Sequence, residues 1–195
     1  MKKIVSLILL ILMLSLAFVS CSEEPAVAPE GMKLVSGDDC AYNLFVPENW
    51  KGTNGYGTYG AYTSDASNVN VSTFTAADIK VEESETNEAT ETTQATDKTA
   101  REQYIDAYWA MCEKSYAEDL NGFSVVEAGK KVTPGGLEAK EYIYTAKYEG
   151  TDYKMQTTVT YAGGVMYILT YTAKADNYGT HTDEIAKIVS EFKFK

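Results

Sequence analysis

The second half of the chain contains three consecutive segments rich in β-branched and aromatic residues: LEAKEYIYTAKY (137–148), TDYKMQTTVTY (151–161) and VMYILTYTAK (165–174). Residues of these types favour strands. Glu149-Gly150 separates the first two segments, and Ala162-Gly163-Gly164 separates the last two. Short connections that contain glycine are typical of β-hairpins. The three segments therefore predict an antiparallel meander.

The last of these segments is apolar on both of its faces. Successive side chains of a strand point to opposite faces of a sheet. One face carries Val165, Tyr167, Leu169, Tyr171 and Ala173, and the other carries Met166 and Ile168. This distribution predicts a central strand in a sheet that is covered on both sides.

Further strands are expected on either side of this meander. Alternation of apolar and polar residues predicts strands at 40–47, 61–64, 68–74 and 123–133. The second and third of these would form a hairpin around Asp65. The sequence KGTNGYGTYG (51–60) is rich in glycine and indicates a turn.

Two helices are also expected. Apolar residues at helical spacing predict a long helix at 99–120, stopped by Asn121-Gly122. Tyr108, Met111 and Cys112 should face the sheet, whereas Glu113 and Lys114 should face water. A short helix near 179–189 leads into a final strand at 192–194.

The order of these elements is β-β-β-α-β-β-β-β-α-β, without regular βαβ alternation. It predicts an α+β fold, an antiparallel β-sheet with the long helix and the C-terminal helix packed on it. Residues 76–98 contain five glutamates and few large apolar residues, so they are expected to form a mobile acidic Thr/Glu-rich loop.

The N-terminus, MKKIVSLILLILMLSLAFVSC (1–21), indicates export. Lys2 and Lys3 precede an apolar segment that is shorter than the about 20 residues of a membrane-spanning helix. Ser20 is small and stands directly before Cys21. This pattern resembles the lipobox of bacterial lipoproteins, in which the cysteine is diacylated and becomes the first residue of the mature protein. We therefore expect a signal peptide at 1–20 and a lipidated Cys21, placing the protein on the extracytoplasmic face of the cell membrane.

The rest of the chain fits one domain behind a tether. Residues 21–31 comprise the lipidated cysteine and a short acidic, proline-containing tether, and 32–195 comprise a single domain. The whole chain carries a formal net charge of −11. Without Lys2 and Lys3, 15 basic residues remain against 28 acidic ones, a net charge of −13. Such a surface repels phosphate backbones, so nucleic acid is not an expected partner.

Three segments of the domain resemble exported PsbP-like domains, which include the extrinsic photosystem II protein and small bacterial lipoproteins such as DcrB. These segments are FVPENW (45–50), ILTYTA (168–173) and SEFKF (190–194). The resemblance covers about 40–195 and implies a PsbP-like α/β/α sandwich. It implies no activity, because no metal or catalytic residue of the family can be matched to this chain.

Two cysteines remain in the domain, Cys40 and Cys112. Outside the cell they are able to form a disulfide. The alternative is that both are small buried hydrophobic residues that never meet. The sequence leaves both alternatives open.

Several motifs of enzymes and metalloproteins are present only in fragments. Gly55–Gly60 matches G-x-G-x-x-G but lacks the preceding strand and following helix of a dinucleotide site. His181 is the single histidine, which excludes a multi-histidine zinc site. A Cys112–His181 nucleophile pair is disfavoured because Cys112 is expected to be buried. The glutamates of the acidic loop lack the glycine that shapes a calcium loop. No catalytic residue, metal site or cofactor is therefore predicted.

Tyrosine is unusually frequent, with 15 in the chain. Those at 142, 144, 148, 153, 161, 167 and 171 fall within the meander, where packing under helices is the expected role. The aromatic residues around the glycine-rich segment are candidates for an exposed binding patch. They are Trp50, Tyr56, Tyr59 and Tyr62.

These observations favour a membrane-anchored, non-enzymatic binding or accessory module of the cell envelope, whose partner is another envelope component. The alternative is a carrier for a small apolar or aromatic ligand held between sheet and helix. A closed pocket of several hundred Å³ would favour the carrier. An exposed aromatic patch at 50–62 would favour the partner-binding module.

Overall fold

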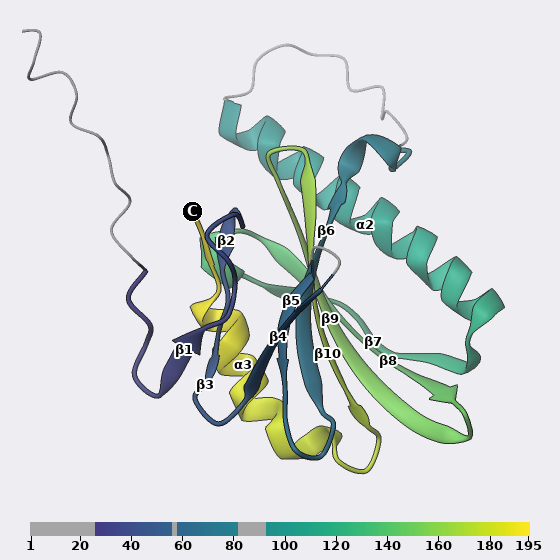
Figure 1. Ribbon diagram of the computed structural model, residues 1–195. Coiled ribbons are helices and arrows are strands. Elements are labelled where there is room, and N and C mark those ends of the chain that lie inside the picture. Colours follow the sequence, from purple (N-terminus) through teal and green to yellow (C-terminus); the bar gives the residue numbers. More distant parts are fainter. Residues whose placement is uncertain (1–25, 56–57, 82–92) are drawn as a thin grey trace, which may run out of the picture.

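The computed structural model describes residues 26–55, 58–81 and 93–195, and Figure 1 shows a large antiparallel sheet at its centre. The order of the strands in this sheet is β4-β5-β6-β10-β9-β8-β7. They are β4 (Lys51–Gly55), β5 (Thr58–Tyr62), β6 (Asn68–Thr75), β7 (Asn121–Val132), β8 (Ala139–Tyr148), β9 (Thr151–Ala162) and β10 (Val165–Lys174). The predicted meander is confirmed, since β8, β9 and β10 are consecutive antiparallel neighbours.

Two-residue turns fix the register of this meander. Glu149 and Gly150 connect β8 to β9 with φ angles of 47° and 81°, and Gly163 and Gly164 connect β9 to β10 with 57° and 83°. Positive φ at both central residues gives a turn whose twist matches that of the sheet. Glycine adopts this conformation without a steric penalty.

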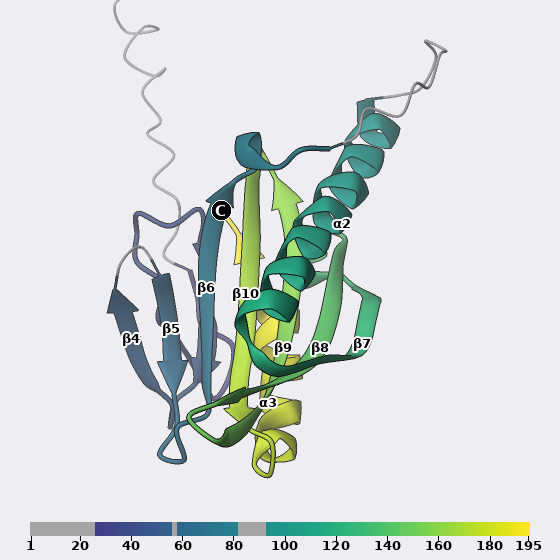
Figure 2. The same cartoon turned by 90° about the vertical axis from the view of Figure 1, so that its right-hand side faces the viewer.

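Helices cover both faces of the sheet, as Figures 1 and 2 show. The long helix α2 (Thr93–Asp119) lies across one face. The opposite face is covered by α3 (Thr182–Glu191) and by two small sheets. The first sheet pairs β1 (Met32–Leu34) with β3 (Phe45–Pro47), and the second pairs β2 (Tyr42–Asn43) with β11 (Lys193–Phe194). Short 3-10 helices are η2 (Ala76–Asp78), η3 (Pro134–Gly136) and η4 (Tyr178–His181). The predicted α+β class with helices on both faces is confirmed.

Each face of the sheet has its own hydrophobic core. On one side Ile105, Trp109 and Cys112 of α2 pack with Tyr142 and Tyr144 of β8. The other core contains Leu44, Phe45, Trp50, Ile185 and Ile188, together with the sheet residues Val69, Val71, Leu169 and Tyr171. Strand β10 contributes to both cores, with Met166 and Ile168 on the α2 side and Tyr167 and Leu169 on the α3 side, as its alternation predicted.

The buried face of α2 differs in part from the expected one. Glu113 and Lys114 are exposed as predicted, and Tyr108 is half-buried. Met111, however, is 45% exposed, so its assignment to the core was wrong. The buried side chains follow the spacing of Ile105, Trp109 and Cys112, and one residue along a helix turns the side chain by about 100°. Met111 therefore points away from the buried face of α2, to which Cys112 belongs.

The glycine-rich segment 51–60 was predicted as a turn, but it forms most of the β4–β5 hairpin. Gly60 allows the neighbouring strand to approach closely, because a Cβ there would lie 2.3 Å from the carbonyl oxygen of Val69. The hairpin predicted around Asp65 is confirmed as β5–β6.

Two segments expected to be free of the domain are partly packed on it. Within the predicted tether, Ala28 packs against the α3-side core, and the carbonyl oxygen of Glu30 accepts a hydrogen bond of 3.0 Å from Lys187 Nζ. Within the predicted acidic loop at 76–98, Ala76 and Ile79 are buried and α2 begins at Thr93. The signal peptide, Cys21 and the glutamates at 82–91 lie outside the described residues. In the ranges that the structure describes, no helix is long and apolar enough to cross a membrane.

Candidate functional site

An open groove of about 680 Å³ runs between α3 and the β7–β8 end of the sheet. Apolar side chains of β7, β8 and α3 form its walls, among them Val132, Ile143 and Val189. Lys130, Glu141, Gln156 and Tyr178 supply polar groups to its floor, and Thr133, Thr182 and Ser190 supply hydroxyls. We call this feature the α3 groove.

A chain of polar contacts fixes the floor of the α3 groove. Glu141 is only 5% exposed, and its Oε1 atom lies 3.1 Å from Lys130 Nζ. Gln156 Nε2 donates a 2.7 Å hydrogen bond to Glu141 Oε2. The Tyr178 hydroxyl donates to Gln156 Oε1 at 3.1 Å. A buried carboxylate is tolerated when it is paired and hydrogen-bonded, as Glu141 is here.

Two titratable groups of this floor, Lys130 and Tyr178, have raised pKa values. The hydrogen bond and charge of Glu141 raise the pKa of Lys130, which stays cationic. Burial raises the pKa of Tyr178 to about 12, so its hydroxyl stays protonated and remains a donor. Lys154 Nζ lies 4.4 Å from the centroid of the Tyr178 ring, within the range of a cation–π contact. The groove thus presents fixed donors and acceptors between apolar walls.

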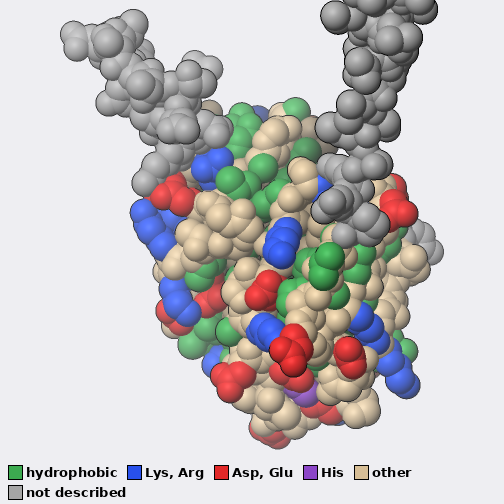
Figure 3. All heavy atoms as spheres, turned by 90° about the vertical axis from the view of Figure 1, so that its left-hand side faces the viewer, with side chains coloured by type: hydrophobic (Ala, Val, Ile, Leu, Met, Phe, Trp, Pro, Cys, Tyr) green, Lys and Arg blue, Asp and Glu red, His purple; other side chains and the backbone are tan. Residues whose placement is uncertain are grey.

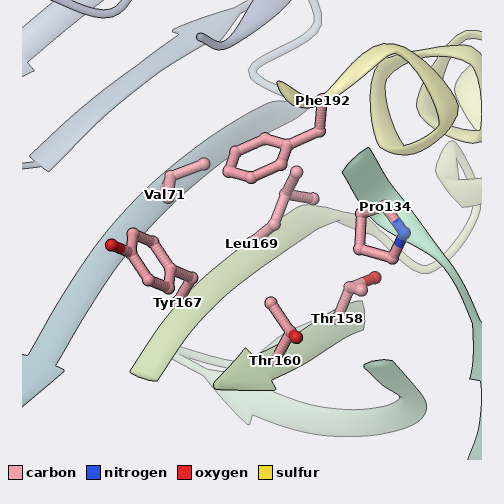
Figure 4. A pocket seen from close by; sticks show the side chains of 7 residues that line it. All are labelled: Val71, Pro134, Thr158, Thr160, Tyr167, Leu169 and Phe192. Carbon is pink, nitrogen blue, oxygen red and sulfur yellow. The ribbon is translucent and has the colours of Figure 1, made fainter. Parts of the chain in front are cut away.

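A second, interior pocket lies between the sheet and the C-terminal end of α3, and Figure 4 shows its lining. Its residues are Val71, Pro134, Thr158, Thr160, Tyr167, Leu169 and Phe192. Its volume of about 10 Å³ is no more than one water molecule needs. Thr158 Oγ1 is buried and has no hydrogen-bond partner among the described residues. This pocket does not accommodate an aromatic ligand in the conformation seen.

The predicted aromatic patch is not continuous on the surface. Trp50 is completely buried, and its indole N–H donates a 3.1 Å hydrogen bond to Glu184 Oε2. Its assignment to an exposed patch was wrong. Tyr59 is half-buried and donates to Asp39 Oδ1 at 3.0 Å, whereas Tyr62 is 41% exposed. Tyr56 lies outside the described residues.

His181 lies between two carboxylates at the start of α3. Its Nδ1 atom is 2.6 Å from Glu184 Oε2, and its Nε2 atom is 3.4 Å from Asp65 Oδ2. The hydroxyl of Thr63 and the backbone N–H of Ser67 donate to Asp65 Oδ1, and these bonds lower the pKa of that carboxyl. The cluster joins the β5–β6 turn to α3. The sequence singled out His181 but gave no signal for its partners.

The two cysteines of the domain are both free. Cys40 packs against the α3-side core and Cys112 belongs to the α2-side core, so the sheet separates them. The disulfide that the sequence left open is therefore not formed. Burial raises the pKa of Cys112, which disfavours a reactive thiolate. The same separation keeps Cys112 apart from His181, which lies on the α3 side beside Trp50.

The residues that the structure describes contain no group of three or more His, Cys, Asp or Glu side chains that could hold a metal ion. Figure 3 shows the face that carries the N-terminal strands, where charged side chains of both signs are scattered among hydrophobic ones. Among the described residues on this face, no large surface of a single charge is seen.

No model of a known protein family matches the chain, and no curated protein matches it in sequence. Solved structures do match. PsbP (CyanoP) from Synechocystis sp. PCC 6803 is 13% identical with a TM-score of 0.50, over 92% of this chain and 99% of that one. LpqN from Mycobacterium tuberculosis, described as involved in cell envelope biogenesis, is 15% identical with a TM-score of 0.50, over 84% and 90% of the two chains.

A third similar structure comes from Bacteroides thetaiotaomicron VPI-5482, with 15% identity and a TM-score of 0.50. The match covers 86% of this chain and 49% of that protein, so the chain spans about half the length of that protein. These likenesses concern the fold. The chain has a PsbP-like α+β fold, as the sequence resemblance implied.

Proposed function

We propose that the protein is a lipid-anchored, non-enzymatic binding module on the extracytoplasmic face of a bacterial cell membrane. The sequence at 1–21, with its basic start, apolar segment and Ser20-Cys21 junction, supports export and acylation. Two acyl chains on Cys21 would supply the hydrophobic attachment that stable anchoring requires. The resemblance to DcrB-like lipoproteins and the shared fold with LpqN, a protein described as involved in envelope biogenesis, agree with this location.

The α3 groove is the observation that supports a binding function best. Its volume of about 680 Å³ falls within the range of about 300 to 1,000 Å³ that is usual for ligand sites. Its floor holds Glu141, Gln156 and Tyr178 in fixed hydrogen bonds, so their geometry exists before a ligand arrives. Preorganised polar groups between apolar walls are suited to recognition. The occupant would be another envelope component, either a protein segment or a small molecule.

If the protein is instead a carrier for a small apolar or aromatic ligand, the α3 groove is also the site that would hold this ligand. The interior pocket near Phe192 measures only about 10 Å³, so a carried ligand would have to lie in the α3 groove. Val132, Ile143 and Val189 would then contact its apolar or aromatic part. The polar floor would contact a hydrogen-bonding group of the same ligand.

Native mass spectrometry on the protein purified from its own membranes tests the site. Ala186 lines the α3 groove and is exposed, so Ala186→Trp should fill the groove without disturbing the core. Ala110→Trp makes the same substitution at an exposed helical position on α2, outside the groove lining, and is the matched control. We expect envelope components to be retained by the parent and by Ala110→Trp, but lost from Ala186→Trp. Equal retention by both variants, or no retained component in the parent, would contradict the proposal.

A further inference from the structure

The two edges of the large sheet are built differently, and Figure 2 shows β4 and β7 at its opposite sides. Strand β7 has three irregularities in its register with β8. Its Lys130 and Lys131 form ion pairs with Glu141 and Glu102. Irregular register and charged side chains are devices that prevent the pairing of an edge with another chain.

Strand β4 has none of these devices apart from a single lysine. Lys51–Gly55 pairs with β5 in five consecutive, regular steps. All five residues are exposed, and Lys51 is the one charged residue among them. Within the described ranges, no backbone hydrogen bond reaches β4 from any element except β5. The outer N–H and C=O groups of β4 are therefore available to a further strand.

A groove of about 370 Å³ accompanies this edge. Lys33, Leu34 and Val35 line one side, and Gly52, Thr53 and Asn54 of β4 line the other. Leu34 is 38% exposed, which gives the groove an accessible apolar surface. Gly52 lies directly over Val35, since a Cβ on Gly52 would be 3.2 Å from Val35 Cγ1. Side chains of an added strand alternate between two faces, so every second one would point toward this groove.

Two cations flank the edge without a carboxylate partner in the described part of the chain. Lys33 Nζ donates to the carbonyl oxygen of Glu48 at 2.8 Å, which leaves its charge uncompensated. Lys51 is exposed and makes no ion pair within the described ranges. In a chain with a net charge of −11, this edge is therefore a place where carboxylates are attracted.

We infer that β4 accepts an extended segment of a partner protein as an additional strand, and that this segment carries apolar side chains flanked by carboxylates. The inference rests on the proposed function only in treating the protein as a binding module, because this edge is separate from the α3 groove. A second copy of the chain fits less well. Two β4 strands paired about Thr53 would leave Lys33 and Lys51 without carboxylates and would bring together two chains of net charge −11.

A synthetic probe of this chemistry tests the inference on the protein purified from membranes. The peptide Glu-Val-Thr-Val-Thr-Glu, labelled with fluorescein, is titrated in a fluorescence polarisation assay. Hydrogen exchange then identifies the amides that the peptide protects. We expect saturable binding and slower exchange at 51–55. The same peptide N-methylated at alternate residues loses the donors of the added strand, and its affinity should fall about tenfold.

Charge variants of the protein provide the matched controls. Lys51→Glu should weaken binding about fivefold or more, because it removes an attraction and adds a repulsion. Lys174→Glu makes the same change at an exposed position at the end of β10 and should leave the affinity unchanged. Circular dichroism establishes that both variants are folded.

Three results would overturn the inference. The first is no binding of the peptide, and the second is binding that N-methylation or Lys51→Glu leaves unchanged. The third is protection of 51–55 without peptide, together with a concentration-dependent dimer in sedimentation, which would assign the edge to a second copy of the chain. Failure of this test would not contradict the proposed binding function of the α3 groove, because that proposal is tested by separate variants.

Discussion

Replacing Trp109 by alanine should remove an aromatic contact that fixes α2 on strand β8. Trp109 is 6% exposed, and its ring stacks on Tyr142 with 3.9 Å between centroids and an interplanar angle of 9°. It also packs against Tyr144 at 5.7 Å. Loss of a buried tryptophan costs about 3–5 kcal/mol, and an aromatic pair adds about 0.5–1.5 kcal/mol. We expect Trp109→Ala to lower the free energy of unfolding by about 4 kcal/mol.

Urea unfolding of the chain beginning at residue 22, followed by circular dichroism, measures this loss. Met111→Ala is the matched control, because Met111 lies on the same helix and is 45% exposed. Its cost should stay within about 0.5 kcal/mol, as for most surface substitutions. A cost below about 1 kcal/mol for Trp109→Ala, or an equal cost for the two variants, would refute the orientation of α2 derived from the contacts.

Two further predictions concern charge and thiols. Because hydrogen bonds lower the pKa of Asp65, its carboxylate stabilises the fold above its ordinary pKa of 3.8, and this contribution disappears as the pH falls through the lower pKa of the folded state. Asp65→Asn should therefore destabilise the protein at pH 7. The difference in thermal stability between this variant and the parent should shrink below about pH 4. A difference that grows in acid would contradict this assignment. Both domain thiols are free, so mass spectrometry after unfolding without reductant should find both labelled by a thiol reagent. In the native state the half-buried Cys40 should be labelled faster than the buried Cys112. A Cys40–Cys112 bridge or faster labelling of Cys112 would be inconsistent with the structure.

Sequence patterns predicted those parts of the fold that depend on local signals. The meander at 137–174 has strands with period-two alternation and glycine-containing turns, and both signals come from neighbouring residues. The alternation along β10 also predicted that both of its faces are buried, because a two-residue period determines which side chains share a face.

The buried face of α2 was harder to predict because apolar and aromatic residues surround much of the helix. Two sets of residues are candidates for the buried face of the helix: Tyr104, Tyr108 and Met111, or Ile105, Trp109 and Cys112. Contacts with β8 decide between them, and above all the stacking of Trp109 on Tyr142. No periodicity within the helix identifies a tyrosine on a strand more than 30 residues away.

The candidate sites depend on residues that are distant in sequence. Trp50 was expected on the surface beside a glycine-rich segment, but Glu184 accepts a hydrogen bond from its indole across 134 positions. The floor of the α3 groove joins β7, β8, β9 and η4 through Lys130, Glu141, Gln156 and Tyr178. None of these four residues forms a recognisable motif with another. Only the fold brings them together.

The N-terminus of the mature protein tests the central claim most directly. Membranes of the producing bacterium are isolated, and the first peptide of the mature chain is identified by mass spectrometry alongside that of Cys21→Ala. We predict that the mature chain begins at Cys21 with a diacylglyceryl group on its sulfur, and that Cys21→Ala is released into the soluble fraction with its fold intact. A chain that still begins at Met1, an unmodified Cys21, or a Cys21→Ala variant that sediments with membranes as fully as the parent would contradict a lipid-anchored binding module.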